Sequence, residues 1–308
     1  MAKDMYQKRK ERQERQANAD ATPNKSNINW YPGHMTKAKR MMVEDIRLID
    51  LVIELVDARI PMSSRNPDID SLAQGKSRVI LLNKADLADD RITEQWINYF
   101  TGMGYHVVKI DSRDRSRMKN VKAIIDNACK EKKERDLKRG IINRPVRAMV
   151  AGIPNVCKST FINSFAGKAC AQTGNRPGVT KGKQWIRLNK DVELLDTPGI
   201  LWPKFEDNTV GIRLAFIGSV NDQVINMHEL SVELISYMIR LCPGKLNERY
   251  KADESLGASD ILSNIATARG CLKKGGEIDY DRAISLLFDD FRSGKLGKIT
   301  LETPEEYA

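Results

Sequence analysis

The fold of this chain is decided by one stretch, Gly152-Ile153-Pro154-Asn155-Val156-Cys157-Lys158-Ser159-Thr160. An apolar run over residues 147–151 precedes it, and a helical pattern with Phe161, Ile162 and Phe165 follows it. A strand, a loop that begins with glycine and a helix, in that order, match the phosphate-binding pattern G-x-x-x-x-G-K-[ST] with one mismatch. An ordinary strand-to-helix turn is the alternative, so the other segments must decide between the two.

The residue types of this stretch suit a polyphosphate. In such loops, successive backbone N–H groups and the positive end of a helix surround the anion. Lys158 would reach the β and γ oxygens, and the hydroxyl of Ser159 would hold Mg²⁺. The stretch predicts these nucleotide-binding residues: Gly152, Pro154, Asn155, Val156, Cys157, Lys158, Ser159 and Thr160.

Cys157 is the mismatch, because the pattern asks for glycine at this position. A Cβ atom there lies where the backbone must approach phosphate, and the dihedral angles of the position can be strained for a residue with a side chain. Either this extra carbon weakens nucleotide binding severely, or a small shift of the loop absorbs it.

The length and composition of the chain limit the number of domains and the kinds of partner that can be expected. With 308 residues the chain is long enough for two domains, each with a buried core. The net charge of +10 predicts a polyanionic partner, usually nucleic acid, although a solvated basic surface is the alternative. The 5 cysteines are scattered without a C-x-x-C pair, which favours reduced thiols and a cytoplasmic location. No apolar run approaches the length of a membrane span, so no membrane partner is expected.

Apolar runs and helical patterns alternate along the first part of the chain. Buried strands are predicted at residues 51–56, 79–82, 106–110 and 146–151. Helices are expected between these strands, at residues 66–74, at residues 91–102 and around residues 121–128. Such an alternation predicts an α/β fold with a parallel-rich sheet and right-handed crossovers.

Polar residues with a specific chemistry follow the strand at 79–82, in the order Asn83-Lys84-Ala85-Asp86. The carboxylate of Asp86 can accept hydrogen bonds from both N1–H and the exocyclic amine of guanine, a paired donor edge that adenine lacks. Asn83 can bridge the loop and the base, and the stem of Lys84 can pack along the purine. The pattern is common by chance, but here it lies at the carboxyl end of a parallel-type strand, where α/β sheets bind ligands.

Two segments after the phosphate loop contain residues that could detect the γ-phosphate of a bound nucleotide. Residues 173–183 are punctuated by Gly and Pro, and Thr180 within them is a natural ligand for Mg²⁺ and a γ-phosphate. Strands are expected at 185–188 and 192–195, and the second ends in the D-x-x-G sequence Asp196 to Gly199. Asp196 would reach Mg²⁺ through water, and the N–H of Gly199 would respond to the γ-phosphate and report its loss.

The ends of the chain differ from its centre. Residues 1–28 mix Lys and Arg with Glu, and are predicted to be a flexible basic extension or a solvated helix that orders on RNA. From about residue 210 only helical patterns remain, which predicts a separate all-helical domain. The predicted domains are therefore residues 1–28, 29–205 and 206–308.

Together these elements resemble a GTPase whose parts are circularly permuted, because base recognition at 83–86 and 111–113 precedes the phosphate loop. Four segments closely resemble the ribosome biogenesis GTPase A family, also called YlqF, over roughly residues 29–295. These are N-W-Y-P-G-H-M at 29–35, D-A-R-I-P at 57–61, G-I-P-N-V-x-K-S at 152–159 and D-T-P-G-I-L-W-P at 196–203.

The resemblance implies more than the residues alone do. Members of that family act in assembly of the bacterial large ribosomal subunit, hydrolyse GTP when stimulated by the subunit, and bind ribosomal RNA through the helical domain. Ser112 belongs to the second base-recognition segment, and Asn155 matches an asparagine that holds K⁺ in related GTPases. Ile200 and Leu201 stand where other GTPases have a water-orienting glutamine. The family's substitute is a histidine that matches His34, although position alone suggests an exposed residue at a helix start.

Two functions of different classes stay open at this point. One is a GTP-hydrolysing assembly factor that uses Mg²⁺ and K⁺, acts as a monomer and has the large subunit, its RNA and guanine nucleotides as partners. The other is a nucleotide-insensitive RNA-binding assembly factor, which follows if Cys157 disables the phosphate loop.

Overall fold

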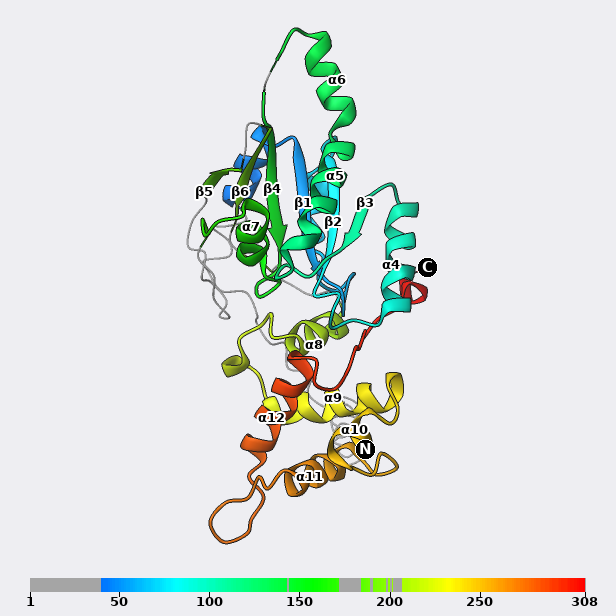
Figure 1. Cartoon of the computed structure of the whole chain (residues 1–308). Coiled ribbons are helices and arrows are strands. Elements are labelled where there is room, and N and C mark those ends of the chain that lie inside the picture. Colours follow the sequence, from blue (N-terminus) through cyan, green and yellow to red (C-terminus); the bar gives the residue numbers. More distant parts are fainter. Residues whose placement is uncertain are drawn as a thin grey trace, which may run out of the picture.

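A computed structural model describes residues 40–142, 144–171, 184–188, 191–197, 199, 201 and 207–307 of the chain. Figure 1 shows two parts along one long axis: a sheet flanked by helices, and below it a group of helices. The expected α/β fold followed by helices is therefore confirmed. Among the described residues, no helix combines the length and apolar character needed to cross a membrane.

The sheet has six strands in the order β3-β2-β1-β4-β6-β5. All neighbouring pairs are parallel except β5 with β6, which are antiparallel. The strands are β1 (Leu51–Asp57), β2 (Ser77–Asn83), β3 (His106–Lys109), β4 (Val146–Gly152), β5 (Gln184–Arg187) and β6 (Val192–Asp196).

Strand β1 lies at the centre of the sheet, and each of its residues is buried. Its continuous apolar sequence is typical of a parallel strand whose two faces are both covered. The chain runs from β1 outward to β2 and β3, and then returns to place β4 on the other side of β1. The reversal falls at the carboxyl ends of β1 and β4, and open α/β sheets bind ligands at such a point.

Helices cover this sheet, and their apolar residues form its core. Trp96 and Phe100 of α4 stack with ring centroids 5.3 Å apart and are buried against β2 residues such as Ile80. Asp89 caps the start of this helix by accepting from the backbone N–H groups of Arg91 and Ile92. The helices of the sheet part are α3 (Asp68–Leu72), α4 (Asp90–Gly102), α5 (Met118–Ala128), α6 (Lys130–Lys138) and α7 (Lys158–Ala166).

The second part, described over residues 207–298, consists of helices and one isolated antiparallel β-bridge between Leu272 and Ile278. The sequence spacing predicts one apolar helix face made of Leu230, Leu234, Ile235, Met238 and Leu241. The first four are buried in α9, whereas Leu241 at the end of that helix is exposed. Asp279 caps α12 by accepting from the N–H of Arg282. The helices are α8 (Asn208–Phe216), α9 (Met227–Leu241), α10 (Lys245–Tyr250), α11 (Ala258–Ala268) and α12 (Tyr280–Arg292).

The last residues of the chain return to the sheet part and end beside α4 (Figure 1). Backbone N–H groups of Ile299 and Leu301 donate to the carbonyl oxygens of Leu87 (2.9 Å) and Arg59 (2.8 Å). The indole N–H of Trp96 donates to a carbonyl of this segment, Glu302 O, at 3.1 Å. The predicted limit at residue 205 stays a prediction. The terminal segment 299–307 lies against the sheet part and also bonds to α8, where Arg213 pairs with Glu302 at 3.0 Å and with Glu306 at 2.6 Å.

A buried ion pair lies at the carboxyl end of β1. Asp57 is fully buried and accepts from the side chain of Arg59 at 2.8 and 2.9 Å, while Lys84 Nζ lies 3.1 Å from the same carboxylate. Burial alone would raise the pKa of Asp57, but the charges of Arg59 and Lys84 outweigh it and hold that pKa well below its ordinary value of 3.8. Asp57 therefore ties the end of β1 to the loop that follows β2.

We expect Asp57→Asn to lower the free energy of unfolding by about 3–5 kcal/mol, because Arg59 is then left as a buried, uncompensated charge. The difference from wild type should be full above pH 3.8 and shrink as the pH falls below it, since the depressed pKa stabilises only the ionised form. Urea denaturation between pH 3 and pH 7 measures both effects, with the exposed Glu277→Gln as control. A loss no larger than that of the control would contradict this role.

Candidate functional site

The expected phosphate loop connects β4 to α7, as the sequence pattern predicts. Glycine is required at its first position by a close approach to β1. A Cβ atom on Gly152 would lie 2.5 Å from the carbonyl oxygen of Leu55 and 3.0 Å from a side-chain carbon of Val156. The loop can therefore start this close to β1 only because Gly152 has no side chain.

Cys157 adopts the left-handed conformation that glycine would supply, with φ 67° and ψ 36°. Asn155 is also left-handed, with φ 59°. The carbonyl of Cys157 accepts the N–H of Phe161 at 2.9 Å, which is the first hydrogen bond of α7. The loop thus keeps its cradle shape around the mismatched residue, at a strain cost of about 1–2 kcal/mol.

Lys158 and Gly199 meet over this loop. The ammonium of Lys158 donates to the carbonyl oxygens of Gly152 (3.0 Å) and Ile153 (2.9 Å), and burial lowers the pKa of Lys158 to about 8. A Cβ atom on Gly199 would lie 2.8 Å from Lys158 Nζ and 2.9 Å from the backbone of Pro154. The glycine of the D-x-x-G segment is thus pressed against the phosphate loop, where only a residue without a side chain fits.

Asp196 ends β6 next to the phosphate loop and has chemistry that fits Mg²⁺. Its side chain is buried, and one oxygen, Oδ1, has no hydrogen-bond partner within the part of the chain that the structure describes. Burial raises the pKa of Asp196 to about 6, against the charge of Lys158. A carboxylate together with hydroxyl and phosphate oxygens is a set of ligands that suits Mg²⁺.

Asn83 joins the loops of the site. Its amide nitrogen donates to Val156 O of the phosphate loop at 2.7 Å. Its amide oxygen accepts from the backbone N–H (2.9 Å) and the hydroxyl (2.8 Å) of Ser112. Ser164 of α7 in turn donates to Ser112 O at 2.6 Å. The side chain of Asn83 therefore holds the phosphate loop and the 111–113 segment together.

The base-recognition segment places two side chains at the same edge. Asp86 accepts from Arg113 at 2.5 Å through Oδ2, while its Oδ1 is buried and lacks a partner among the described residues. The side chain of Arg113 is 67% exposed and also contacts Asp111, so it is a partner that a ligand can displace. Lys84 has a left-handed backbone, with φ 58°, and is held by Asp57.

Two predicted site residues, His34 and Thr180, lie outside the described residues, so their roles stay predictions. Ser159 and Thr160 lie in the first turn of α7, as expected. Sequence reasoning missed the Asp57–Arg59 pair, whose D-A-R-I-P segment served only as a mark of resemblance. It also missed Gly218 and Ser219, which touch the phosphate loop and belong to no pattern in the sequence.

Comparison with known proteins agrees with this geometry. A family model described as 50S ribosome-binding GTPase matches residues 147–258. Two relatives named Ribosome biogenesis GTPase A are similar over almost the whole chain. The protein from Bacillus cereus is 49% identical over 281 residues, covering 91% of this chain and 95% of the relative. The protein from Priestia megaterium is 45% identical, covering 91% and 98%.

Solved structures of YlqF have the same arrangement. The GDP-bound structure has a TM-score of 0.65 and 28% identity, covering 86% of this chain and 100% of that one. The GNP-bound structure from T. maritima has a TM-score of 0.62 and 29% identity, covering 87% and 99%. The expected circular permutation of the GTPase fold is confirmed by this likeness and by the observed strand order.

We expect the stability of variants at position 157 to follow the order glycine, cysteine, valine. Cys157→Gly relieves the left-handed strain and raises the free energy of unfolding by up to about 1 kcal/mol, the entropy of glycine offsetting part of the gain. Cys157→Val lowers it, because β-branched residues tolerate this conformation least. Urea denaturation of the three proteins gives the order. A glycine variant less stable than wild type would show that the position is not strained.

Proposed function

This chain belongs to the ribosome biogenesis GTPase A family, and from that premise we propose that it is a GTPase that assists assembly of the large ribosomal subunit. The observation that carries the proposal is the meeting of three separate segments at one edge of the sheet. Asn83 ties the base-recognition segment to the phosphate loop, and Gly199 of the D-x-x-G segment lies against Lys158 of that loop. Base, phosphates and metal would each find suitable groups within this one site.

Guanine selectivity would come from Asp86. Guanine presents two adjacent donors to a carboxylate, and the partnerless Oδ1 with the exposed Oδ2–Arg113 contact leaves both oxygens able to accept. Adenine would leave one oxygen of a part-buried carboxylate without a donor, which costs about 1–3 kcal/mol.

The phosphate groups would take over the hydrogen bonds that Lys158 now gives to the loop carbonyls. Ser159 and Thr180 are the proposed direct ligands of Mg²⁺, and Asp196 would hold it through water. When bound, Mg²⁺ neutralises charge on the phosphate oxygens. The backbone N–H of Gly199 is the proposed sensor of the γ-phosphate, and the close approach of Gly199 to Lys158 and Pro154 supports this role.

Water activation needs a group from outside the D-x-x-G segment. Leu201 is buried and has no polar side-chain atom with which to orient water. His34 is the proposed substitute. Asn155 is the proposed ligand for K⁺, because its amide nitrogen is engaged by Gly218 O while the amide oxygen, the atom that ligates cations, takes no part in that bond.

The proposed partners are the large ribosomal subunit and its RNA. The net charge of +10 supports binding to a polyanion, and the relatives' name refers to ribosome biogenesis. We place the RNA contact on the helical part and on the basic residues 1–28, and propose a cytoplasmic monomer. A nucleotide-insensitive RNA-binding factor is not favoured, because the phosphate loop keeps its shape with Cys157 in place.

We expect His34→Ala to slow subunit-stimulated GTP hydrolysis by about 10²–10⁴-fold, as for loss of a general acid–base group, and to leave GDP affinity nearly unchanged. Single-turnover hydrolysis at saturating large subunits measures the chemical step apart from docking. The control is His228→Ala, an exposed histidine of the helical part. Hydrolysis by His34→Ala at the wild-type rate would exclude the catalytic role, and a wild-type protein without GTP hydrolysis would exclude the proposed function.

A further inference from the structure

The phosphate loop is hydrogen-bonded to the helical part. The amide nitrogen of Asn155 donates to Gly218 O at 2.5 Å, and the hydroxyl of Ser219 donates to Pro154 O at 2.9 Å. Ser219 is buried, so neither water nor another protein group competes freely for this contact. Both donor–acceptor pairs join the cradle to residues 217–221, the loop that follows α8.

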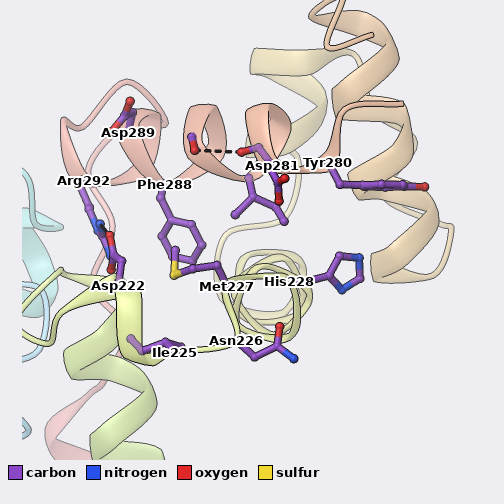
Figure 2. A pocket seen from close by; sticks show the side chains of 12 residues that line it. Asp222, Ile225, Asn226, Met227, His228, Tyr280, Asp281, Phe288, Asp289 and Arg292 are labelled. Atoms are coloured by element: carbon purple, nitrogen blue, oxygen red, sulfur yellow. Dashed lines mark hydrogen bonds and ion pairs between the residues drawn. The ribbon is translucent and has the colours of Figure 1, made fainter. Parts of the chain in front are cut away.

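One side chain of α12 holds this loop at both ends. Arg292 donates to the carbonyl oxygens of Ala215 and Phe216, both at 2.9 Å, at the carboxyl end of α8. The same guanidinium pairs with Asp222, at 2.7 and 2.8 Å, where η3 (Asp222–Val224) begins. Figure 2 shows Arg292 and Asp222 facing each other beside a pocket of about 460 Å³ between α12 and the start of α9. Arg292 therefore bonds to the residues on both sides of the loop 217–221 and holds its two ends together.

The absence of a side chain on Gly218 allows Arg292 to approach the loop 217–221. Its φ is +75°, and a Cβ atom there would lie 3.2 Å from the guanidinium carbon of Arg292. A side chain at this position would push the loop or Arg292 aside. The position of the Gly218 carbonyl, which accepts from Asn155, therefore depends on the close packing of Gly218 against Arg292.

We propose that Gly218, Ser219 and Arg292 form a latch through which the helical part positions the phosphate loop for nucleotide. The proposal rests on the proposed function, since it concerns the same nucleotide site. These three are positioning residues: they touch the cradle or hold what touches it, and they contact no nucleotide group themselves. The latch is separate both from the D-x-x-G segment and from the terminal segment 299–307, so it is a further connection between the two parts.

The physical reason is the conformation of Asn155. Its left-handed backbone costs asparagine less than most residues with a side chain but more than glycine, and the bond to Gly218 together with the Ser219–Pro154 bond helps to hold it. Without the latch, the loop can relax away from the shape that receives phosphate, and binding must restore it. Because coupling between sites is reciprocal, a partner that moves the helical part would change nucleotide affinity, and nucleotide would change affinity for that partner by the same factor.

The test is the affinity of full-length variants for fluorescently labelled GDP, with Mg²⁺ present. We expect Ser219→Ala to weaken binding about fivefold, as for one lost hydrogen bond, and Arg292→Met about tenfold. Arg249→Met is the matched control, because Arg249 also bonds a carboxylate of α12, Asp290 at 2.9 Å, but does not touch the loop 217–221. Thermal melting of each variant reports folding separately, and Arg292→Lys replaces Arg292→Met if the latter does not fold.

A double-mutant cycle distinguishes positioning from general destabilisation. If Arg292 acts through Asn155, Arg292→Met should have little further effect on GDP binding in an Asn155→Ala background. Additive effects, or Arg292→Met and Ser219→Ala proteins that bind GDP like wild type, would overturn the latch while leaving the proposed function intact. A wild-type chain that binds no GDP would overturn both.

Discussion

The amide of Asn83 donates to Val156 O and accepts from the N–H and the hydroxyl of Ser112. Because Asn83 is buried, loss of one of these bonds would leave a buried polar group without a partner, which costs about 1–3 kcal/mol. This side chain joins the two base-recognition segments, 83–86 and 111–113, to the phosphate loop. Their relative positions, and hence the site, depend on this side chain.

The site depends on the order of the strands in the sheet and not on the order in which the strands occur in the sequence. The carboxyl ends of β1, β2, β4 and β6 lie side by side in the sheet whatever the order in which the chain visits them. Circular permutation instead changes which part of the chain follows the D-x-x-G segment of the site. Beyond β6 the chain enters the helical part, and the helical part contacts the phosphate loop again through Gly218 and Ser219. The nucleotide site is therefore connected to the helical part both along the chain and by these hydrogen bonds.

Much of this could be predicted from local sequence. Strands β1, β2 and β4 are continuous apolar runs, and the residues after them carry recognisable chemistry, so both strands and site segments were placed close to their bounds. The sequence predicts that Asn83 bridges a loop and the base, but not its bonds to Val156 and Ser112. Arg292 and the return of residues 299–307 depend on tertiary packing, which leaves no periodic signal. Leu241 continues an apolar stripe but is exposed, because the helix ends there.

The most direct measurement is calorimetric titration of wild type and Asn83→Ala with GDP and with ADP in the presence of Mg²⁺. We expect wild type to bind GDP at least about tenfold more tightly than ADP, since adenine leaves the Asp86 carboxylate short of a donor. Asn83→Ala should lose most of its GDP affinity, because the loops are no longer held together. Equal binding of the two nucleotides by wild type, or GDP binding by Asn83→Ala at wild-type strength, would contradict the site described.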